Sequence, residues 1–442
     1  TIDQPVSIDE VKKFLAERDL HAETRYVPKK LINNLTGEWK QKIAIIGAGP
    51  AGLSCAYYLA ERGYSPTVFE KNEKPGGMMT YGIPSYKLQK DVIDAEIDII
   101  RQLGVEIRCG VEVGKDITIQ ELKDQGYQAF YIAIGCQGGR LPGVANETAE
   151  GTDIAVHFLK EALSNPNQKY EGDVVVVGGG NVAIDCARTA HRFYPDSVSM
   201  FCLESRETMP ASRQEIAEAE EEDVKIHAGW GPKEVLVDEK GHVNGIVFKR
   251  CLSTIDPETG AFSPKYDEEE TMTVKADRII FAIGQSIIWG DLLKDTGVTF
   301  SRGAYPAADR FTYQTEDEAI FVGGDVFTGP KFVINAIGQG HEAAESLIRY
   351  VSEYNVPQTT GRDRRFFKPL DTDNITVPSY DHAGRQEPEV ENIKDPGHSF
   401  ADPRKIFTEE QVKTECSRCL SCGVNVVDVT IAGESAGSAC VS

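Results

Sequence analysis

The stretch KIAIIGAGPAG at 42–52 decides the fold of this chain, and DVVVVGGGNVAIDCAR at 173–188 repeats its pattern. In each stretch an apolar run typical of a buried strand leads into Gly-x-Gly-x-x-Gly or Gly-x-Gly-x-x-Ala, and helical periodicity follows. Glycines in such a turn let the backbone approach a pyrophosphate, and the free N–H groups that open the helix stabilise its charge. One glycine-rich turn is weak evidence, but two in the same strand–turn–helix context predict two dinucleotide sites.

Apolar runs alternate with helical periodicity along the rest of the chain, which predicts an α/β fold with two Rossmann-like nucleotide-binding domains. The expected strands are 42–46, 66–70, 105–108, 129–135, 173–177, 197–203 and 319–324. The expected helices are 7–19, 51–62, 89–103, 181–192, 211–222 and 338–353. Alternating apolar and polar residues over 224–281 predict an antiparallel meander. Ser7 and Glu10 predict a capping box on the first helix.

The second nucleotide-binding unit interrupts the first, so we expect the first domain to be discontinuous. A later stretch rich in Pro, Asp, Arg and Asn has little periodicity and is typical of an extended tail. The expected segments are a helical linker over 1–40, a first nucleotide-binding domain over 41–150 and 290–354, a second over 151–289, an extended surface tail over 355–415, and a cysteine segment over 416–442.

Composition excludes several classes of partner. The 442 residues are 40% hydrophobic, which supports buried cores, and 47 Lys and Arg against 69 Asp and Glu leave a net charge of −22. A surface that acidic disfavours nucleic acid and anionic membranes as partners. No apolar run is long enough to span a bilayer, and no secretory signal opens the chain, so we expect a cytoplasmic protein. Six scattered cysteines fit reduced thiols, namely Cys55, Cys109, Cys136, Cys186, Cys202 and Cys251.

Two further segments distinguish a flavin site from a plain dinucleotide site. Glu70 ends the second predicted strand, where a carboxylate accepts hydrogen bonds from a ribose diol. In PGGMMTYGIPSYKL at 75–88, the glycines let the backbone approach a flat ring. In VGGDVFTGPKFVINAIGQGHEA at 322–343, Asp325 is placed to bind a ribityl hydroxyl, and Gly338-x-Gly340 is predicted to open a helix toward the N1–C2=O side of a flavin. A surface acid and a flexible loop remain the alternative interpretations.

These stretches, together with MPASRQE at 209–215 and the strand ends YIAIG and FAIG, resemble the small subunit of glutamate synthase. They also resemble the flavoprotein modules of dihydropyrimidine dehydrogenase and of electron-bifurcating ferredoxin–NAD(P)H transhydrogenases, over about residues 5–350. The resemblance implies the disulfide-reductase or adrenodoxin-reductase type of fold, with FAD on the first unit and the last helix and the nicotinamide on the second. It also implies that electrons leave through iron–sulfur clusters of a larger complex, and that the 1–40 linker normally follows a cluster-binding region. Ferredoxin is among the partners that it suggests.

The expected site residues follow from the turns and from the resemblance. For FAD they are Gly47, Gly49, Pro50, Ala51, Gly52, Glu70, Lys71, Gly77, Met78, Gly82, Ile83, Pro84, Val113, Ala133, Gly135, Gly324, Asp325, Gln339, Gly340 and Ala343. For the nicotinamide dinucleotide they are Gly178, Gly180, Asn181, Val182, Ala183, Glu204, Ser205, Arg206, Arg213, Ala282 and Gly284. Hydride transfer depends on stacking and distance, so no catalytic acid or base is expected.

One departure from the family concerns the choice of nucleotide. NADPH-using relatives place two arginines at the end of the second strand of the nicotinamide domain, where this chain has Leu203 and Glu204. A carboxylate there repels a 2′-phosphate and binds a free ribose diol, which favours NADH. Arg206 and Arg213 keep NADPH open, since either could reach a phosphate.

The remaining four cysteines lie in the last segment as Cys416-x-x-Cys419-x-x-Cys422 and, further on, Cys440. The first three have the spacing of iron–sulfur ligands, and we expect a [4Fe–4S] cluster. The usual nearby fourth cysteine followed by proline is missing, so zinc ligands and free thiols stay open.

Taken together, the sequence predicts an NAD(P)H-dependent FAD oxidoreductase module of a larger complex. Such a complex could be electron-bifurcating, and an NADPH-dependent glutamate synthase small subunit is the alternative. A flavin disulfide reductase is disfavoured because 71–90 holds no cysteine, and a flavin monooxygenase because it would not carry the cysteine segment.

Overall fold

The computed structural model describes residues 4–32, 37–301, 303–352, 382–391 and 398–419, and four two-residue strands, β16 (Val426–Val427), β17 (Thr430–Ile431), β18 (Glu434–Ser435) and β19 (Ala439–Cys440). The chain divides into two compact units. The larger unit comprises Val27–Arg362 and Ile393–Asp402, and the smaller unit comprises Thr1–Tyr26, Asp363–Asn392 and Pro403–Ser442. Both glycine turns lie in the larger unit.

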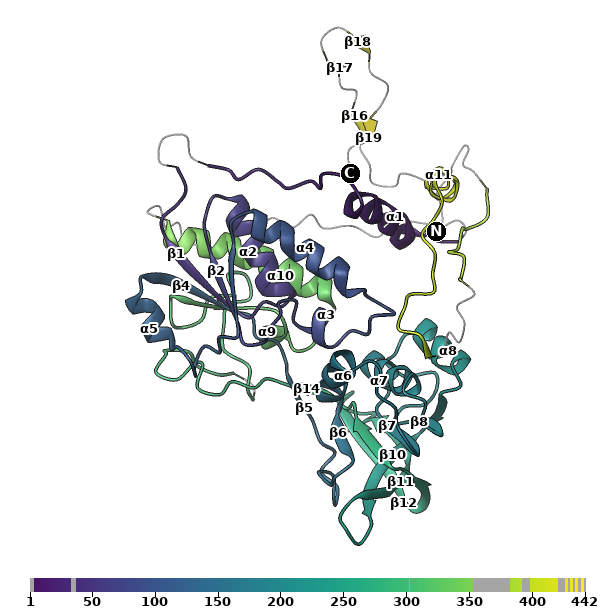
Figure 1. Ribbon diagram of the computed structural model, residues 1–442. Coiled ribbons are helices and arrows are strands. Elements are labelled where there is room, and N and C mark those ends of the chain that lie inside the picture. Colours follow the sequence, from purple (N-terminus) through teal and green to yellow (C-terminus); the bar gives the residue numbers. More distant parts are fainter. Residues whose placement is uncertain are drawn as a thin grey trace. The chain divides into compact units, whose positions relative to one another are not determined.

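The first glycine turn belongs to a five-stranded parallel sheet (Figure 1). In spatial order its strands are β15 (Ile320–Val322), β4 (Tyr127–Ile132), β1 (Lys42–Ile46), β2 (Thr67–Glu70) and β3 (Glu106–Cys109). The helices of this part are α2 (Pro50–Glu61), α3 (Met78–Tyr81), α4 (Lys90–Gln102), α5 (Ile119–Asp124), α9 (Asp325–Thr328) and α10 (Val333–Val351). Every residue of β1 after Lys42 is buried, as expected for a central parallel strand covered on both faces.

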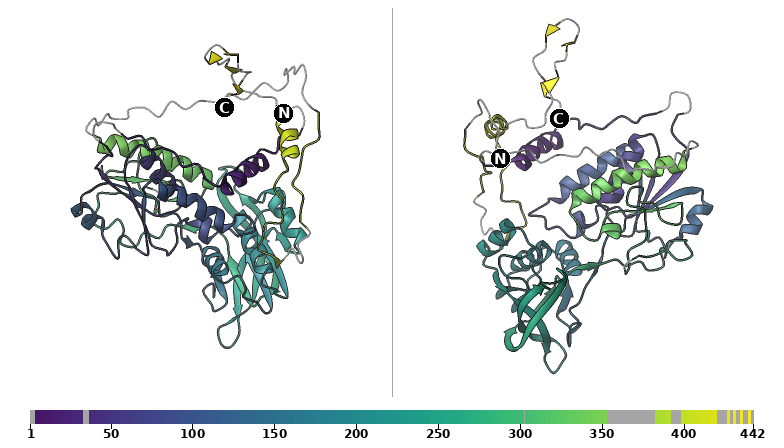
Figure 2. Two further views of the ribbon diagram at one scale, coloured as in Figure 1. Left: turned by 45° about the horizontal axis from the view of Figure 1, so that its top comes forward. Right: turned by 180° about the vertical axis from the view of Figure 1, so that it is seen from behind.

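Helices α2 and α10 lie side by side although they are far apart in the sequence, as the views in Figure 2 also show. A Cβ added to Gly340 would lie 2.2 Å from the carbonyl oxygen of Ala51, so this glycine is needed for close contact between the two helices. The expectation that Gly338-x-Gly340 opens the last helix is wrong, because α10 begins at Val333 and both glycines lie inside it. The glycines signalled a packing contact and not a helix start.

The second glycine turn belongs to another five-stranded parallel sheet, with an antiparallel three-stranded sheet beside it in the sequence. The parallel strands are, in spatial order, β6 (Thr152–Ile154), β13 (Arg278–Phe281), β7 (Asp173–Val177), β8 (Ser197–Cys202) and β9 (Lys225–Ala228). The antiparallel strands are β10 (Trp230–Val237), β11 (Val243–Ile255) and β12 (Phe262–Lys275), and the helices are α6 (Ala155–Ser164), α7 (Asn181–His191) and α8 (Arg213–Glu221).

The meander predicted over 224–281 is therefore only partly correct. Its middle forms β10, β11 and β12, but its first and last strands, β9 and β13, join the parallel sheet. β13 is buried over three of its four residues and lies between two parallel neighbours, which local alternation of apolar and polar residues cannot reveal.

The chain passes between the two parallel sheets twice, and the two crossings pair with each other. β5 (Gly138–Gly139) follows the first sheet, β14 (Gln285–Ser286) follows the second, and the two strands are antiparallel. A Cβ added to Gly138 would lie 2.5 Å from the Ser286 hydroxyl, so the crossing strands are in close contact.

The smaller unit contains α1 (Ile8–Leu20) and α11 (Glu409–Ser417). The end of the range predicted as an extended tail is thus helical, and 353–381 lies outside the described residues. Glu415 is fully buried, accepts hydrogen bonds from the backbone N–H groups of Ser7 and Gln386 at 2.7 and 2.5 Å, and pairs with Arg418 at 2.9 Å. The predicted capping box is wrong: Ser7 is the N-cap of α1 but makes no side-chain capping bond, since its hydroxyl donates to the Gln386 carbonyl instead.

Within the described part of the chain, every helix is too short or too polar to cross a membrane. The six scattered cysteines are unpaired; Cys109 is half-buried and the others are buried. Burial raises the pKa of the Cys136 and Cys202 thiols to about 12, so these side chains are neutral near pH 7.

Candidate dinucleotide sites

The first glycine turn is fixed by contacts that only glycine allows. Gly47 has a φ of +105°, and a Cβ there would lie 2.5 Å from the carbonyl oxygen of Ala133 at the end of β4. Gly49 is the N-cap of α2 and provides no side-chain cap, so the first N–H groups of the helix have no side-chain partner from the cap position. These groups face a pocket at the carboxyl edge of the first sheet, where an anion would be stabilised.

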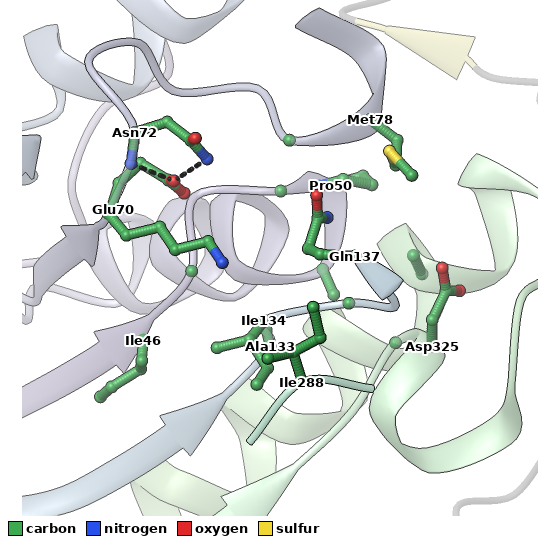
Figure 3. A pocket seen from close by; sticks show the side chains of 18 of the residues that line it. Ile46, Pro50, Glu70, Asn72, Met78, Ala133, Ile134, Gln137, Ile288 and Asp325 are labelled. Carbon is green, nitrogen blue, oxygen red and sulfur yellow. Dashed lines mark hydrogen bonds between the residues drawn. The ribbon is translucent and has the colours of Figure 1, made fainter. Parts of the chain in front are cut away.

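The pocket gathers residues from both segments of the first predicted domain (Figure 3). The predicted FAD residues that line it are Gly47, Gly49, Pro50, Ala51, Glu70, Lys71, Gly77, Met78, Val113, Ala133, Gly135, Gly324 and Asp325. The predicted residues that are not part of its lining are Gly52, Gly82, Ile83, Pro84, Gln339, Gly340 and Ala343. Figure 3 shows Glu70 and Asp325 on opposite sides of the pocket.

Glu70 braces the first turn with both carboxylate oxygens. The side chain is only 5% exposed; Oε2 accepts a hydrogen bond from the Ala48 N–H at 2.9 Å, and Oε1 accepts from the backbone and side-chain nitrogens of Asn72 at 2.8 and 2.7 Å. A carboxylate oxygen offers more than one lone pair, so this arrangement leaves capacity for a ligand hydroxyl.

On the other side, Asp325 begins the short helix α9 and is largely buried. Burial raises the pKa of this carboxyl, while the Lys331 backbone N–H, 3.3 Å from Oδ1, opposes that shift. Gln339 does not line the pocket; its Oε1 accepts a hydrogen bond from the Gly324 N–H at 2.7 Å and thereby fixes the backbone that carries Asp325.

The loop 75–88 is held rigidly against the first turn. A Cβ on Gly77 would lie 2.7 Å from the Cα atom of Gly49, so two glycine backbones touch at the entrance to α2. Lys90 donates from Nζ to the carbonyl oxygens of Met79 and Ile83 at 2.7 and 2.5 Å, and burial lowers its pKa to about 8. The glycines therefore serve packing within the loop, and Gly77 alone of those in this loop lines the pocket.

The second glycine turn has the same close contact at its first glycine as the first turn, and open space in front of its second glycine. A Cβ on Gly178 would lie 2.4 Å from the Ala282 carbonyl oxygen, which parallels Gly47 and Ala133. Gly180 is the N-cap of α7 without a side-chain cap, and a Cβ there would meet no atom within 4 Å. Asn181 accepts a hydrogen bond from the Ser212 N–H at 2.9 Å, and Val182 is exposed at the helix start, whereas Ala183 is fully buried.

Glu204 lies just after β8, at the strand end that is predicted to select NADH or NADPH. A Cβ on Gly179 would lie 2.7 Å from the Glu204 Oε2 atom, so this carboxylate lies over the glycine turn. Arg206 is engaged by Glu220 at 2.5 Å, and Ser205 donates to Glu207 at 2.8 Å. Arg213 is exposed at the start of α8. The Glu204 carboxylate thus lies beside the turn, as the NADH prediction requires. Of the two arginines that could bind a 2′-phosphate, Arg206 is already paired with Glu220.

Of the predicted metal ligands, Cys416 and Cys419 are described and exposed. The Cys419 N–H donates to the Cys416 carbonyl oxygen at 3.1 Å, which forms a tight turn at the end of α11. Their neighbours Glu415 and Arg418 are the buried ion pair described above, so the turn is anchored on both sides. The side chains of Cys422 and Cys440 lie outside the described residues.

Sequence reasoning missed about half of the pocket lining. The missed residues are Ile46, Phe69, Asn72, Val111, Glu112, Ile134, Gln137, Ile288, Trp289, Leu292, Lys331, Phe332, Val333 and Ala336. Several directly neighbour a predicted residue, and a rule that includes the flanks of every strand end would have found them. Ile288, Trp289 and Leu292 follow the second chain crossing and carry no local motif.

Comparison with known proteins identifies the family. The model of the pyridine nucleotide-disulphide oxidoreductases matches residues 41–340. The chain is 33% identical to the NADP(+)-dependent formate dehydrogenase subunit beta of Moorella thermoacetica, over 98% of this chain and 64% of that subunit. It is 32% identical to the glutamate synthase [NADPH] small chain of Escherichia coli K12, over 70% of this chain and 69% of the relative. It is also 32% identical to the NAD-dependent dihydropyrimidine dehydrogenase subunit PreT of Escherichia coli O157:H7, over 79% and 76%.

Solved structures share the fold. Mycobacterium tuberculosis FprA in complex with NADPH superimposes with a TM-score of 0.59 at 16% identity, covering 70% of this chain and 84% of that one. Thioredoxin reductase of T. acidophilum gives 0.53 at 22% identity, covering 70% and 98%.

These matches confirm the predicted resemblance, the α/β fold with two nucleotide-binding sheets, and an NAD(P)H-dependent FAD oxidoreductase. The chain spans less than two thirds of the Moorella subunit, at 64% of its length. By the family model and by these relatives, the chain belongs to the pyridine nucleotide-disulphide oxidoreductase family.

Proposed function

We propose that the chain binds FAD at the first glycine turn and NADH, in preference to NADPH, at the second, and that it is the electron-input module of a larger iron–sulfur enzyme. The observation that carries this proposal is the pair of glycine turns in one compact unit. Each turn follows a strand of its own parallel sheet and begins a helix that has no side-chain N-cap. FAD held at the first turn would supply hydride exchange with a nicotinamide ring and one-electron release to acceptors.

The residues of the first pocket fit FAD. The uncapped start of α2 would stabilise the pyrophosphate, Glu70 would accept the adenosine ribose hydroxyls, and Asp325 would accept a ribityl hydroxyl. The close approach of Gly77 to Gly49 keeps side chains away from the pyrophosphate path. Since none of these groups needs to donate or remove a proton, binding and exclusion of water are their whole contribution.

The preference for NADH is supported by charge at the second turn. The Glu204 carboxylate lies against Gly179, where a 2′-phosphate would be repelled and a free ribose diol accepted. Arg206, which could have offset this charge, is paired with Glu220. The names of the relatives include both NADP(+) and NAD, so they support neither choice alone.

The route onward is proposed to start at the smaller unit. Cys416 and Cys419 expose two thiols on one anchored turn, a suitable arrangement for two ligands of a [4Fe–4S] cluster with Cys422 and a fourth ligand, for which Cys440 is the candidate. The partner is then a further iron–sulfur or flavin subunit, and electron bifurcation would be a property of that assembly. We place the enzyme in the cytoplasm on the evidence of its unpaired thiols.

A second candidate is the small subunit of an NADPH-dependent glutamate synthase, because the chain covers 69% of that relative from Escherichia coli K12. Glutamate formation with the matching large subunit, and preference for NADPH, would distinguish it.

The test begins with the full chain purified without oxygen. Acid extraction should release FAD at about one per chain, and NADH should bleach the flavin absorbance faster than NADPH at equal concentration. Extraction of FMN alone, or protein that cannot be reconstituted with FAD, contradicts the proposal. Iron and sulfide analysis, with loss of the electron paramagnetic resonance signal in Cys416→Ser and Cys419→Ser, tests the cluster separately.

A further inference from the structure

The start of the loop 75–88 lines the first pocket, and its far end carries an ion cluster with α7 and α8 that the proposed function does not use. Lys87 pairs through Nζ with Oδ1 of Asp185 on α7 and with Oε2 of Glu215 on α8. The three side chains are 20%, 14% and 22% exposed, so all are largely removed from water. Arg188 adds a weaker contact to Glu215 at 3.8 Å.

The preceding residue, Tyr86, strengthens the same junction. It is 4% exposed, and the guanidinium carbons of Arg192 and Arg188 lie 3.9 and 4.8 Å from its ring centroid. Both arginines are buried and paired with Glu222. Two consecutive residues of the loop, one aromatic and one charged, are therefore held by α7 and α8 of the second sheet.

This connection joins the first pocket to the helix that begins at the second glycine turn. Gly77 and Met78, at the start of the loop, line the first pocket, and Lys90 fixes the backbone of Met79 and Ile83 between them and Lys87. Asp185 lies on the first turns of α7, the helix that begins at the second glycine turn. A displacement of either sheet relative to the other would have to break the Lys87 cluster or distort the loop.

We propose that Lys87 is a positioning residue that sets the nicotinamide against the flavin by tying the flavin-side loop to the helix of the second glycine turn. This inference rests on the proposed function, since it takes FAD at the first turn and the nicotinamide at the second. Lys87 acts through Asp185 and Glu215 and is not assigned any contact with either nucleotide.

Charge explains why the tie depends on Lys87. Without its ammonium group, the loop loses its attraction to α7 and α8, and the carboxylates of Asp185 and Glu215 stay in a site with little water beside the weaker Arg188 contact. Arginine at the same position restores the positive charge and can donate to both carboxylates. Its planar guanidinium differs in shape from the compact ammonium of lysine. Reaction geometry is sensitive to such shifts, because a displacement of about 1 Å costs about 100-fold in rate.

The experiment uses the full-length holoprotein and four variants, Lys87→Met, Lys87→Arg, Asp185→Asn and Lys249→Met. Lys249 is the matched control: it is 19% exposed and pairs with Glu268 at 2.6 Å, but both residues belong to the β11–β12 hairpin and bridge no two sheets. Two properties are measured for each protein. One is the limiting rate of flavin bleaching by NADH, and the other is the long-wavelength absorbance of dithionite-reduced flavin mixed with NAD⁺, which reports stacking of the electron-rich reduced flavin on the electron-poor nicotinamide.

We expect Lys87→Met to lose about 100-fold in limiting rate and to lose the long-wavelength band. FAD content and nicotinamide affinity should stay within about twofold of wild type. Lys87→Arg should recover most of the band, Asp185→Asn should lie between, and Lys249→Met should match wild type.

An unchanged band and rate in Lys87→Met would overturn the inference while leaving the proposed function intact. If Lys87→Met does not retain FAD, Asp185→Asn decides, and a wild-type band in that variant overturns the inference. Failure of wild-type protein to be bleached by either nicotinamide would instead contradict the proposed function itself.

Discussion

The two glycine turns share one backbone plan but differ in how closed they are. At the first turn, Glu70 is 5% exposed and accepts hydrogen bonds from the turn and from Asn72. A pocket extends from Glu70 to Asp325. At the second, the space in front of Gly180 is open, and Glu204 lies over the turn half-buried. This difference agrees with the proposal that the first turn retains its nucleotide and the second exchanges one.

The largest expected effect separates two kinds of glycine position, a crowded one at Gly47 of the first turn and an open one at Gly180 of the second. Gly47→Ala forces a Cβ to within 2.5 Å of the Ala133 carbonyl at a φ of +105°, so we expect a loss of about 2–4 kcal/mol in unfolding free energy and loss of FAD. Gly180→Ala, in open space, should change unfolding free energy by less than about 0.5 kcal/mol and weaken only nicotinamide binding. Urea unfolding and flavin absorbance measure both, and equal losses in Gly47→Ala and Gly180→Ala would contradict the contrast between a crowded and an open position.

The second difference concerns the two acids. Glu204→Arg removes repulsion and adds a phosphate partner, so the ratio of kcat/KM for NADPH over NADH should rise by about 10- to 100-fold. Glu70→Gln, the counterpart at the first turn, should leave this ratio unchanged and instead weaken FAD retention. If wild type already prefers NADPH by kcat/KM, the assignment of Glu204 is wrong.

The smallest effect tests equivalent positions on the two helices, Ser54 on α2 and Asp185 on α7. Ser54 holds α2 to α10 through a neutral hydrogen bond to the Ile337 carbonyl at 2.7 Å, whereas Asp185 is held by charge. Burial raises the pKa of Asp185 to about 6, against the opposing pull of Lys87 and Arg188 and with support from Glu215. The protonated acid is therefore favoured in the folded state, and its contribution to stability is present below about pH 4 and is lost as the pH rises through about 6.

We accordingly expect the unfolding free energy of wild type, relative to Asp185→Asn, to fall by about 1–3 kcal/mol between pH 4 and pH 7. The difference between wild type and Ser54→Ala should stay constant over that range. Urea unfolding at a series of pH values provides the measurement, and a flat difference for Asp185→Asn would show that the pKa of this carboxyl is not raised in the folded protein.

The features of the fold that depend on neighbouring residues could be predicted from the sequence. The glycine turns, the β1 and β7 strands and the position of Glu70 depend on short-range periodicity, and the structure places them as expected. The predicted start of α10 is wrong because Gly340 does not mark a helix start but is needed for contact with α2. Trp289 and the partners of Lys87 could not be predicted, since each depends on a pairing between distant segments that leaves no mark on its neighbours. Asn72 is different, because it lies two residues after Glu70 and could have been found from the flank of that strand end.

The buried Glu415 has a consequence for the order in which the protein is made. Its carboxylate joins the backbone of Ser7, 408 positions earlier in the chain, to that of Gln386. Ser7 leaves the ribosome long before Glu415 is synthesised. The N-terminus of α1 therefore lacks its hydrogen bond to Glu415 while the larger unit is being synthesised. The turn that carries Cys416 and Cys419 is then anchored only after both parallel sheets have been synthesised, so any cluster inserted there would be received by a chain whose nucleotide-binding sheets have already been translated.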